Sequence, residues 1–152
     1  VHILLLNQIG IIKSPYKLRT DAPRQGRYSP EISELIVFEE YLDGLDSIKR
    51  HEYLYVFYWQ DKAERDKLKV TPPGELGEKG VFSNRSPARP NPIALCLVKV
   101  QKIENNSLFV KWLDAIDGSP LLDIKPFVKE LDCVKIPGKT FSNSNQFPYF
   151  SR

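Results

Sequence analysis

Apolar residues along this chain fall into short runs whose spacing is typical of β-strands. The run over residues 4–12 predicts a first strand that bends or bulges at Gly10 and ends at Ser14-Pro15. Residues 35–38 predict a short second strand, and the patterned segment at residues 41–45 predicts a short helix. The first third of the chain is therefore expected to be mainly strands and loops.

Longer apolar stretches follow and predict central strands. Residues 53–59 are apolar at odd and even positions alike, which is typical of a strand covered on both faces. Residues 93–100 and 108–113 repeat this pattern, and the Glu-Asn-Asn-Ser turn at residues 104–107 joins them into a predicted hairpin. Residues 121–124 predict one more strand, whereas no amphipathic helix longer than about ten residues is predicted. The expected fold is mostly β: a compact single-domain β-barrel, closed or half-closed, with few short helices.

Composition adds limits to this picture. A chain of 152 residues suits one hydrophobic core, so we expect a barrel domain over residues 1–137. Residues 138–152 form a polar tail with several aromatic side chains. This tail is expected to pack against the protein rather than to extend into solvent. With 41% apolar and 27% charged residues and a net charge of +3, the chain is not a generic polycation. It lacks a membrane-spanning run and a signal peptide, and a cytoplasmic protein is expected.

The cysteine and histidine residues predict no metal site and no catalytic triad. Cys96 and Cys133 lie far apart in the chain without a CxxC spacing, and we expect both to be buried free thiols. His2 and His51 are isolated from each other and from any cluster of possible ligands.

The segment RSPARPNP, residues 85–92, is the most unusual loop of the chain. Its three prolines fix φ and remove three backbone donors, so the loop holds Arg85, Arg89 and Asn91 in set directions. A rigid loop that presents two guanidinium groups and an amide suits ligand binding, because little conformational entropy is left to lose. A stiff connection with solvated arginines fits the residues almost as well, and a proline-rich ligand for an SH3-type partner is a third interpretation.

A second loop, Asp117-Gly118-Ser119-Pro120, is first of all a turn in which glycine can take a positive φ. Carboxylates at Asp114, Asp117 and Asp123 can accept hydrogen bonds from hydroxyl groups or amines, yet solvated loop aspartates fit equally well. No dinucleotide fingerprint or Walker sequence accompanies them, so a Rossmann cofactor site is not predicted. Residue chemistry alone therefore stops at a β-rich domain that binds a small ligand or RNA.

Five segments together resemble the TsaA-like family, the TrmO-type tRNA methyltransferases, over about residues 9–127. They are IGIIKSPY (9–16), APRQG (22–26), LYVFYW (54–59), GVFSNRSPARPNPIAL (80–95) and DGSPLLDIKPF (117–127). The resemblance implies a non-Rossmann β-barrel that binds S-adenosylmethionine and forms a homodimer with the cofactor near the subunit interface. It also implies N6-methylation of N6-threonylcarbamoyladenosine beside the anticodon of tRNA. The chain departs from the family pattern mildly within the motifs, and only about 25 residues follow the last motif, so no counterpart of the additional C-terminal portion of some members is expected in them.

The resemblance also implies which residues bind the ligands. The expected cofactor pocket consists of Pro23, Arg24, Gln25, Gln60, Asp61, Arg85, Leu95, Asp117, Gly118, Ser119 and Pro120. Within it, Leu95 is expected to pack on adenine, Arg85 to pair with the cofactor carboxylate, and turn backbone groups to hold polar atoms. Tyr58, Trp59 or an aromatic residue of the second subunit is expected to face the sulfonium.

The expected partner is the tRNA anticodon loop, with Arg89 and Asn91 gripping the substrate nucleotide. A basic strip is expected to assist them, although solvated side chains fit as well; it consists of Lys13, Lys17, Arg19, Arg24 and Arg27. No catalytic base is assigned. Two other functions stay open: a methyltransferase of the same pocket acting on another nucleotide or small molecule, and a non-catalytic module that binds S-adenosylmethionine or RNA.

Overall fold

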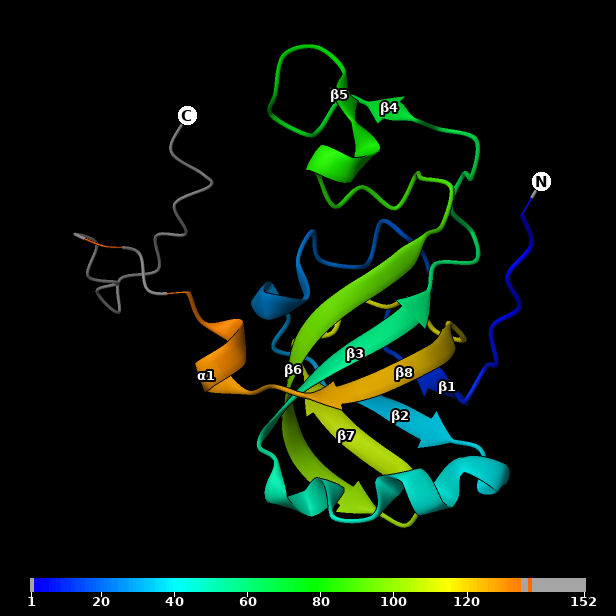
Figure 1. Ribbon diagram of the computed structural model, residues 1–152, viewed down its shortest axis with the longest axis vertical. Coiled ribbons are helices and arrows are strands. Elements are labelled where there is room, and N and C mark those ends of the chain that lie inside the picture. Colours follow the sequence, from blue (N-terminus) through cyan, green and yellow to red (C-terminus); the bar gives the residue numbers. More distant parts are fainter. Residues whose placement is uncertain (1, 135–136, 138–152) are drawn as a thin grey trace.

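Six strands of the computed structural model, which describes residues 2–134 and 137, close into a barrel in the order β1-β2-β7-β6-β3-β8 (Figure 1). All neighbouring strands are antiparallel, and β1 completes the closure by pairing with both β2 and β8. The barrel strands are β1 (Gly10–Lys13), β2 (Ser33–Val37), β3 (Tyr53–Trp59), β6 (Ile93–Glu104), β7 (Ser107–Lys111) and β8 (Pro120–Pro126). The predicted fold class, a mostly β single barrel, is confirmed.

The core of the barrel follows from the two-residue period of its strands. In β3, Leu54, Val56 and Tyr58 point inward and are buried, while the alternate aromatic residues lie half-buried on the outside. Inward residues of the other strands complete one cluster, for example Leu35 of β2 and Leu108 of β7. Because each large apolar side chain contributes about 1.5–3 kcal/mol when it is fully buried, this cluster supplies the main stabilisation of the barrel.

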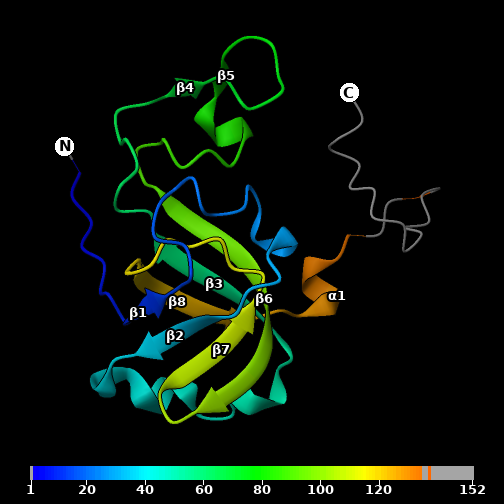
Figure 2. The ribbon, with the colours of Figure 1, turned by 180° about the vertical axis from the view of Figure 1, so that it is seen from behind.

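Short elements occupy the two ends of the barrel (Figures 1 and 2). At one end lie the 3-10 helices η2 (Glu39–Leu45) and η3 (Ile48–Arg50). At the other end an arm extends outward, with β4 (Lys69–Val70) paired to β5 (Lys79–Gly80). The remaining elements are η1 (Gly26–Tyr28), η4 (Val81–Ser83) and α1 (Lys129–Asp132). The predicted short helix at residues 41–45 is thus present as part of η2.

The prediction for the first strand is wrong at its beginning. Residues 2–8 are exposed and adopt no regular structure, and β1 begins only at Gly10. On the β2 side the ladder ends where Phe38 donates a hydrogen bond to the Ile9 carbonyl, because that chain then turns into η2; on the β8 side it ends where the Ile9 amide donates to the Leu121 carbonyl. No bulge occurs at Gly10 in its pairing with β2; instead, a side chain there would overlap the Ile36 carbonyl oxygen.

The predicted hairpin and the central strand are confirmed. β6 and β7 are joined at Asn105, which adopts the left-handed conformation with φ 51°. β3 pairs on both sides, with β6 and with β8, and its ladder to β8 shifts register between Phe57 and Tyr58. Such a shift changes the direction of the strand as it approaches the arm end of the barrel.

The two cysteines differ in their exposure. Cys96 is buried as predicted, whereas Cys133 is exposed, because it follows α1 outside the barrel wall. The predicted tail at residues 138–152 lies outside the described residues. Within the part of the chain that the structure describes, no helix is long and apolar enough to cross a membrane.

Candidate functional site

A cavity of about 400 Å³ opens at the arm end of the barrel, where β6 begins. Most of its walls come from loops, and the first residues of β6 form an apolar side. The lining residues are Arg24, Gln25, Gln60, Phe82, Asn84, Arg85, Ser86, Arg89, Asn91, Ile93, Ala94, Leu95 and Asp114. We call this space the arginine cavity.

The loop at residues 84–91 is held in shape by its own polar side chains. The Arg89 guanidinium donates to three backbone carbonyls: to Asn84 and Ser86 from Nη1, each at 3.0 Å, and to Val81 from Nη2 at 2.9 Å. The Asn84 side chain accepts a hydrogen bond from the Ser86 amide at 2.9 Å. These bonds add to the restriction that the prolines impose, so the expectation of a rigid loop has a second physical cause.

Seven of the predicted ligand-binding residues meet in this cavity. Five were expected to bind the cofactor and two the substrate: Arg24, Gln25, Gln60, Arg85 and Leu95, then Arg89 and Asn91. Leu95 is 42% exposed although it lies in a strand, so an apolar surface is available to a ligand at this wall. Pro23 and Asp61 adjoin lining residues in the chain but do not themselves line the cavity.

The other four predicted residues, Asp117 to Pro120, form a turn outside the lining of the arginine cavity. Gly118 has φ 84°, as the turn prediction requires. The amides of Asp117, Gly118 and Ser119 donate to the carbonyls of Tyr16, Ile12 and Ile116. Because these three donors are engaged within the chain, and the Ser119 carbonyl accepts the Ile12 amide at 3.0 Å, the turn offers a ligand the carbonyl oxygens of Asp117 and Gly118 rather than its amides.

Asp117 itself is tied to the loop that follows β1. Its carboxylate accepts hydrogen bonds from the Ser14 amide at 2.9 Å and from Lys17 Nζ at 2.7 Å. The hydrogen bond from Lys17, followed by that from Ser14, lowers the pKa of Asp117 below its ordinary value of 3.8. Lys17 is therefore paired, and Arg27, another member of the predicted basic strip, lies over the Trp112 ring at 3.4 Å.

Asp114 lines the arginine cavity, although the sequence alone did not decide between a ligand-binding role and a solvated loop position for this residue. Its Oδ1 accepts hydrogen bonds from the Tyr58 hydroxyl at 2.7 Å and from the Cys96 thiol at 2.9 Å. Burial, and then the charge of Asp114, raises the pKa of both Tyr58 and Cys96. Both donors therefore stay protonated, and they fix the carboxylate at the cavity wall.

The expected contact of Tyr58 with a sulfonium is wrong. Tyr58 is only 2% exposed, and its ring belongs to the barrel core because even-numbered residues of β3 point inward. Trp59 points outward, and the Arg65 guanidinium lies 5.1 Å from its ring centroid. A cation–π contact from β3 would therefore have to compete with Arg65.

The motif at residues 22–26 is coupled to Asp114 through backbone packing. A side chain at Gly26 would overlap the carbonyl oxygen of Trp112 and press on the Asp114 amide. Trp112 adopts φ 73°, a conformation that residues other than glycine rarely take. The glycine thus permits a close approach that brings Arg24 and Gln25 to the same cavity as Asp114.

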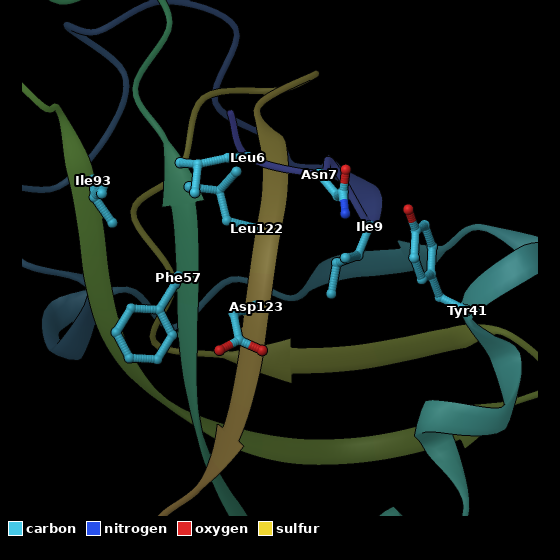
Figure 3. A pocket seen from close by; sticks show the side chains of 8 residues that line it. All are labelled: Leu6, Asn7, Ile9, Tyr41, Phe57, Ile93, Leu122 and Asp123. Atoms are coloured by element: carbon cyan, nitrogen blue, oxygen red, sulfur yellow. The ribbon is translucent and has the colours of Figure 1, made fainter. Parts of the chain in front are cut away.

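A second cavity of about 430 Å³ lies on the outer side of β3 and β8 (Figure 3). Figure 3 shows Leu6 and Asn7 from the N-terminal segment together with Tyr41 of η2, Phe57 and Leu122. Ile9, Ile93 and Asp123 complete the lining. We call this space the outer groove; none of the predicted ligand-binding residues lines it.

The donor set of the arginine cavity fits S-adenosylmethionine chemically. Phe82, Ile93 and Leu95 provide apolar surface for a purine, and Arg85 provides a fork for a carboxylate. The set does not resemble a metal centre, and among residues 2–134 and 137 no group of three or more possible ligands could hold a metal ion.

Comparison with known proteins places this geometry in a family. The family model described as the tRNA-methyltransferase O N-terminal domain matches residues 11–133. An "S-adenosyl-L-methionine-binding protein" of Archaeoglobus fulgidus is 56% identical over 131 residues, which cover 86% of this chain and 94% of that protein. A mouse "tRNA (adenine(37)-N6)-methyltransferase" is 38% identical over 138 residues, 85% of this chain and 32% of the enzyme.

Solved structures agree with this assignment. The crystal structure of TrmO from P. aeruginosa superposes with a TM-score of 0.73 and 26% sequence identity. The match covers 88% of this chain and 59% of the TrmO chain, so this chain spans well under two thirds of that protein. The model match over residues 11–133 and the 56% identity to the archaeal relative show that the chain belongs to the TrmO family.

Proposed function

We propose that this protein is an S-adenosylmethionine-dependent tRNA methyltransferase that methylates N6 of N6-threonylcarbamoyladenosine beside the anticodon. The observation that carries the proposal is the convergence of two family motifs on one cavity: residues 22–26 through Arg24 and Gln25, and residues 80–95 through Arg85 and Leu95. Two relatives support the chemistry, since one is named for binding S-adenosylmethionine and another for methylating adenine 37 of tRNA at N6.

The residues around the arginine cavity would hold the cofactor by separate contacts. Leu95 would pack on the adenine, and Arg85 would pair with the carboxylate of the methionine part. Pro23, Arg24, Gln25, Gln60 and Asp61 would complete this side of the pocket. The turn formed by Asp117, Gly118, Ser119 and Pro120 would contribute the carbonyl oxygens of Asp117 and Gly118, because its three amides and the Ser119 carbonyl are engaged within the chain.

S-adenosylmethionine would supply an electrophilic methyl group, and the protein would hold this group and the N6 atom of the substrate in a reactive orientation. Well-oriented reactants can lower a barrier by about 7–11 kcal/mol without a covalent enzyme intermediate. The loop at residues 84–91 suits this task because Arg89 holds two of its carbonyls and ties it to the Val81 carbonyl of η4, so the loop needs little reordering when a ligand binds.

The tRNA anticodon loop would approach the rim of the same cavity. Asn91 is exposed there and can read a base edge, whereas Arg89 must share its guanidinium between the loop carbonyls and a substrate. Phe82 is 83% exposed at the rim and offers an apolar ring to a base or to a second subunit. A homodimer with the cofactor near its interface is part of the proposal, since the cavity is open on this side.

Thermal unfolding of the purified protein tests the cofactor part. S-adenosylmethionine at about 100 times its Kd should stabilise the fold by about 2.7 kcal/mol, and ATP and NAD serve as controls. No shift at millimolar concentration would contradict the cofactor assignment.

Transfer of a labelled methyl group to tRNA tests the reaction. Transfer is expected to tRNA that carries the threonylcarbamoyl group and not to the same tRNA without it. Transfer to another nucleotide would keep the enzyme class and change the substrate, whereas a thermal shift without any transfer would indicate a binding module.

A further inference from the structure

Three aspartates lie within residues 114–123, and the structure separates them by their partners. Asp117 is bound to Lys17 and to the Ser14 amide. Asp123 is paired with Lys125 at 2.8 Å, and it lines the outer groove rather than the arginine cavity. Asp114 lines the arginine cavity and forms no ion pair with any residue in the described part of the chain.

The two oxygens of the Asp114 carboxylate have different surroundings. Oδ1 accepts both the Tyr58 hydroxyl, at 2.7 Å, and the Cys96 thiol, at 2.9 Å. Oδ2 accepts no hydrogen bond from residues 2–134 or 137. One oxygen therefore fixes the orientation of the group, while the other keeps its lone pairs for a ligand in the cavity.

The other side chains that line the cavity with Asp114 are cationic or neutral. Arg24 and Arg85 line the same cavity, and both groups that donate to Oδ1 are neutral and buried. Burial raises the pKa of Cys96 and Tyr58, so neither competes with the carboxylate as a proton acceptor at neutral pH. Gln60, the other polar lining group near Tyr58, cannot accept a proton at such a pH.

The chemistry of the substrate requires a proton acceptor. An N6 that carries a carbamoyl group shares its lone pair with the adjacent carbonyl, so it is a weak nucleophile until it loses its proton. We propose, on the basis of the function proposed above, that Asp114 is the catalytic residue that accepts this proton through Oδ2. As the bond from N6 to the methyl carbon forms, the carbon–sulfur bond breaks and its electron pair returns to sulfur; the N6 proton passes to Asp114 and then to solvent.

Asp114→Asn tests this role with little change in shape, because the amide oxygen can still accept from Tyr58 and Cys96. Loss of a general base is expected to lower kcat for methyl transfer by about 10²–10⁴-fold. Stabilisation by S-adenosylmethionine in thermal unfolding should stay within about 1 °C of the wild type, since the cofactor contacts proposed above remain. Asp123→Asn is the matched control, because its carboxylate lies in the outer groove, and it should retain wild-type kcat.

The dependence of the methylation rate on hydroxide concentration distinguishes a catalytic base from a residue that only maintains the structure. The residual rate of Asp114→Asn should rise by about tenfold per pH unit above neutrality, because hydroxide then removes the proton, whereas the wild-type rate should change far less. Tyr58→Phe removes one of the two donors to Oδ1, so Tyr58 is tested as a positioning residue. It should lower kcat by about tenfold with little change in KM.

Each outcome has one meaning. A rate for Asp114→Asn within threefold of wild type would overturn the base assignment and leave the proposed function intact. Loss of the cofactor-induced stabilisation in this variant would also overturn it, because Asp114 would then be a cofactor ligand. Absence of transfer by the wild-type protein would overturn the proposed function and the base assignment together.

Discussion

The arginine cavity and the outer groove have nearly the same size, about 400 and 430 Å³, and Ile93 lines both, yet they differ in the number and charge of their polar groups. The arginine cavity has three guanidinium groups, four primary amide side chains and one carboxylate around an apolar wall. The outer groove has mainly aliphatic and aromatic side chains with one amide and one carboxylate (Figure 3). Volume alone therefore does not identify the site, whereas the density of polar groups in fixed positions does.

The two spaces also differ in how their walls are held. Loop 84–91 is fixed by prolines and by the three hydrogen bonds from Arg89. One wall of the outer groove is residues 6–7, which belong to an exposed segment without regular structure. A preformed wall binds a ligand at a lower entropic cost. The loops, and not the barrel strands alone, therefore make the site.

The largest expected effect comes from breaking the packing beneath the arginine cavity. Gly26→Ala places a methyl group against the Trp112 carbonyl, and such overpacking is expected to cost about 3 kcal/mol in the free energy of unfolding. Stabilisation by S-adenosylmethionine should be lost as well. Gly44→Ala is the control, because no atom lies within 4 Å of a side chain there, and urea unfolding of both variants measures the difference.

The next effect concerns the loop itself. Arg89→Ala removes the guanidinium from three carbonyls, and hydrogen bonds from a charged donor predict a loss of about 2 kcal/mol in stability. Methylation should fall too if the loop must be rigid. Arg50→Ala, at the opposite end of the barrel in η3, should be neutral. Equal stability of the two variants would show that the prolines alone hold the loop.

A pair of leucines compares the two spaces directly. Leu95→Ala should weaken S-adenosylmethionine binding by about tenfold, because the apolar wall of the arginine cavity loses area. Leu122→Ala, which alters the outer groove, should leave the Kd unchanged. Isothermal titration of both variants provides the measurement, and the reverse result would move the cofactor to the outer groove.

The smallest expected effect lies at Asp117. Its lowered pKa means that the ion pair with Lys17 stabilises the fold at neutral pH, and that this contribution is lost as the pH falls below 3.8 and through the lowered value. Lys17 is 67% exposed, so Asp117→Asn should cost less than about 1 kcal/mol at pH 7. The difference from wild type should vanish in acid; a difference that persisted at pH 2 would point to the turn geometry instead.

Much of the fold was predictable because strand periodicity is a local property. Residues 53–59 predicted a central strand from their apolar residues alone, and β3 has these bounds. Seven predicted ligand-binding residues also line one cavity, and six of them belong to the family motifs at residues 22–26 and 80–95. Their roles toward cofactor and tRNA stay predictions.

The wrong predictions have physical causes that involve other parts of the fold, so a local sequence pattern cannot reveal them. Residues 4–6 look like strand residues, but a strand needs partners; on the β2 side the neighbouring chain has already turned into η2, and the pairing with β8 does not extend beyond Gly10. Asp114 could not be chosen among three aspartates because its distinction comes from Tyr58 and Cys96, which belong to other strands. Tyr58 was misplaced because the sequence does not say which face of β3 points inward.

The contrast between the two cysteines gives the molecule a kinetic reporter. Cys133 is exposed, whereas the Cys96 thiol is buried and held by Asp114, so alkylating reagents should modify the two at very different speeds. Labelling of Cys96 requires the wall of the arginine cavity to open locally. The half-life of unmodified Cys96, followed by mass spectrometry, would thus report how often the wall behind Asp114 opens. Cys133 would serve as the internal standard in the same reaction.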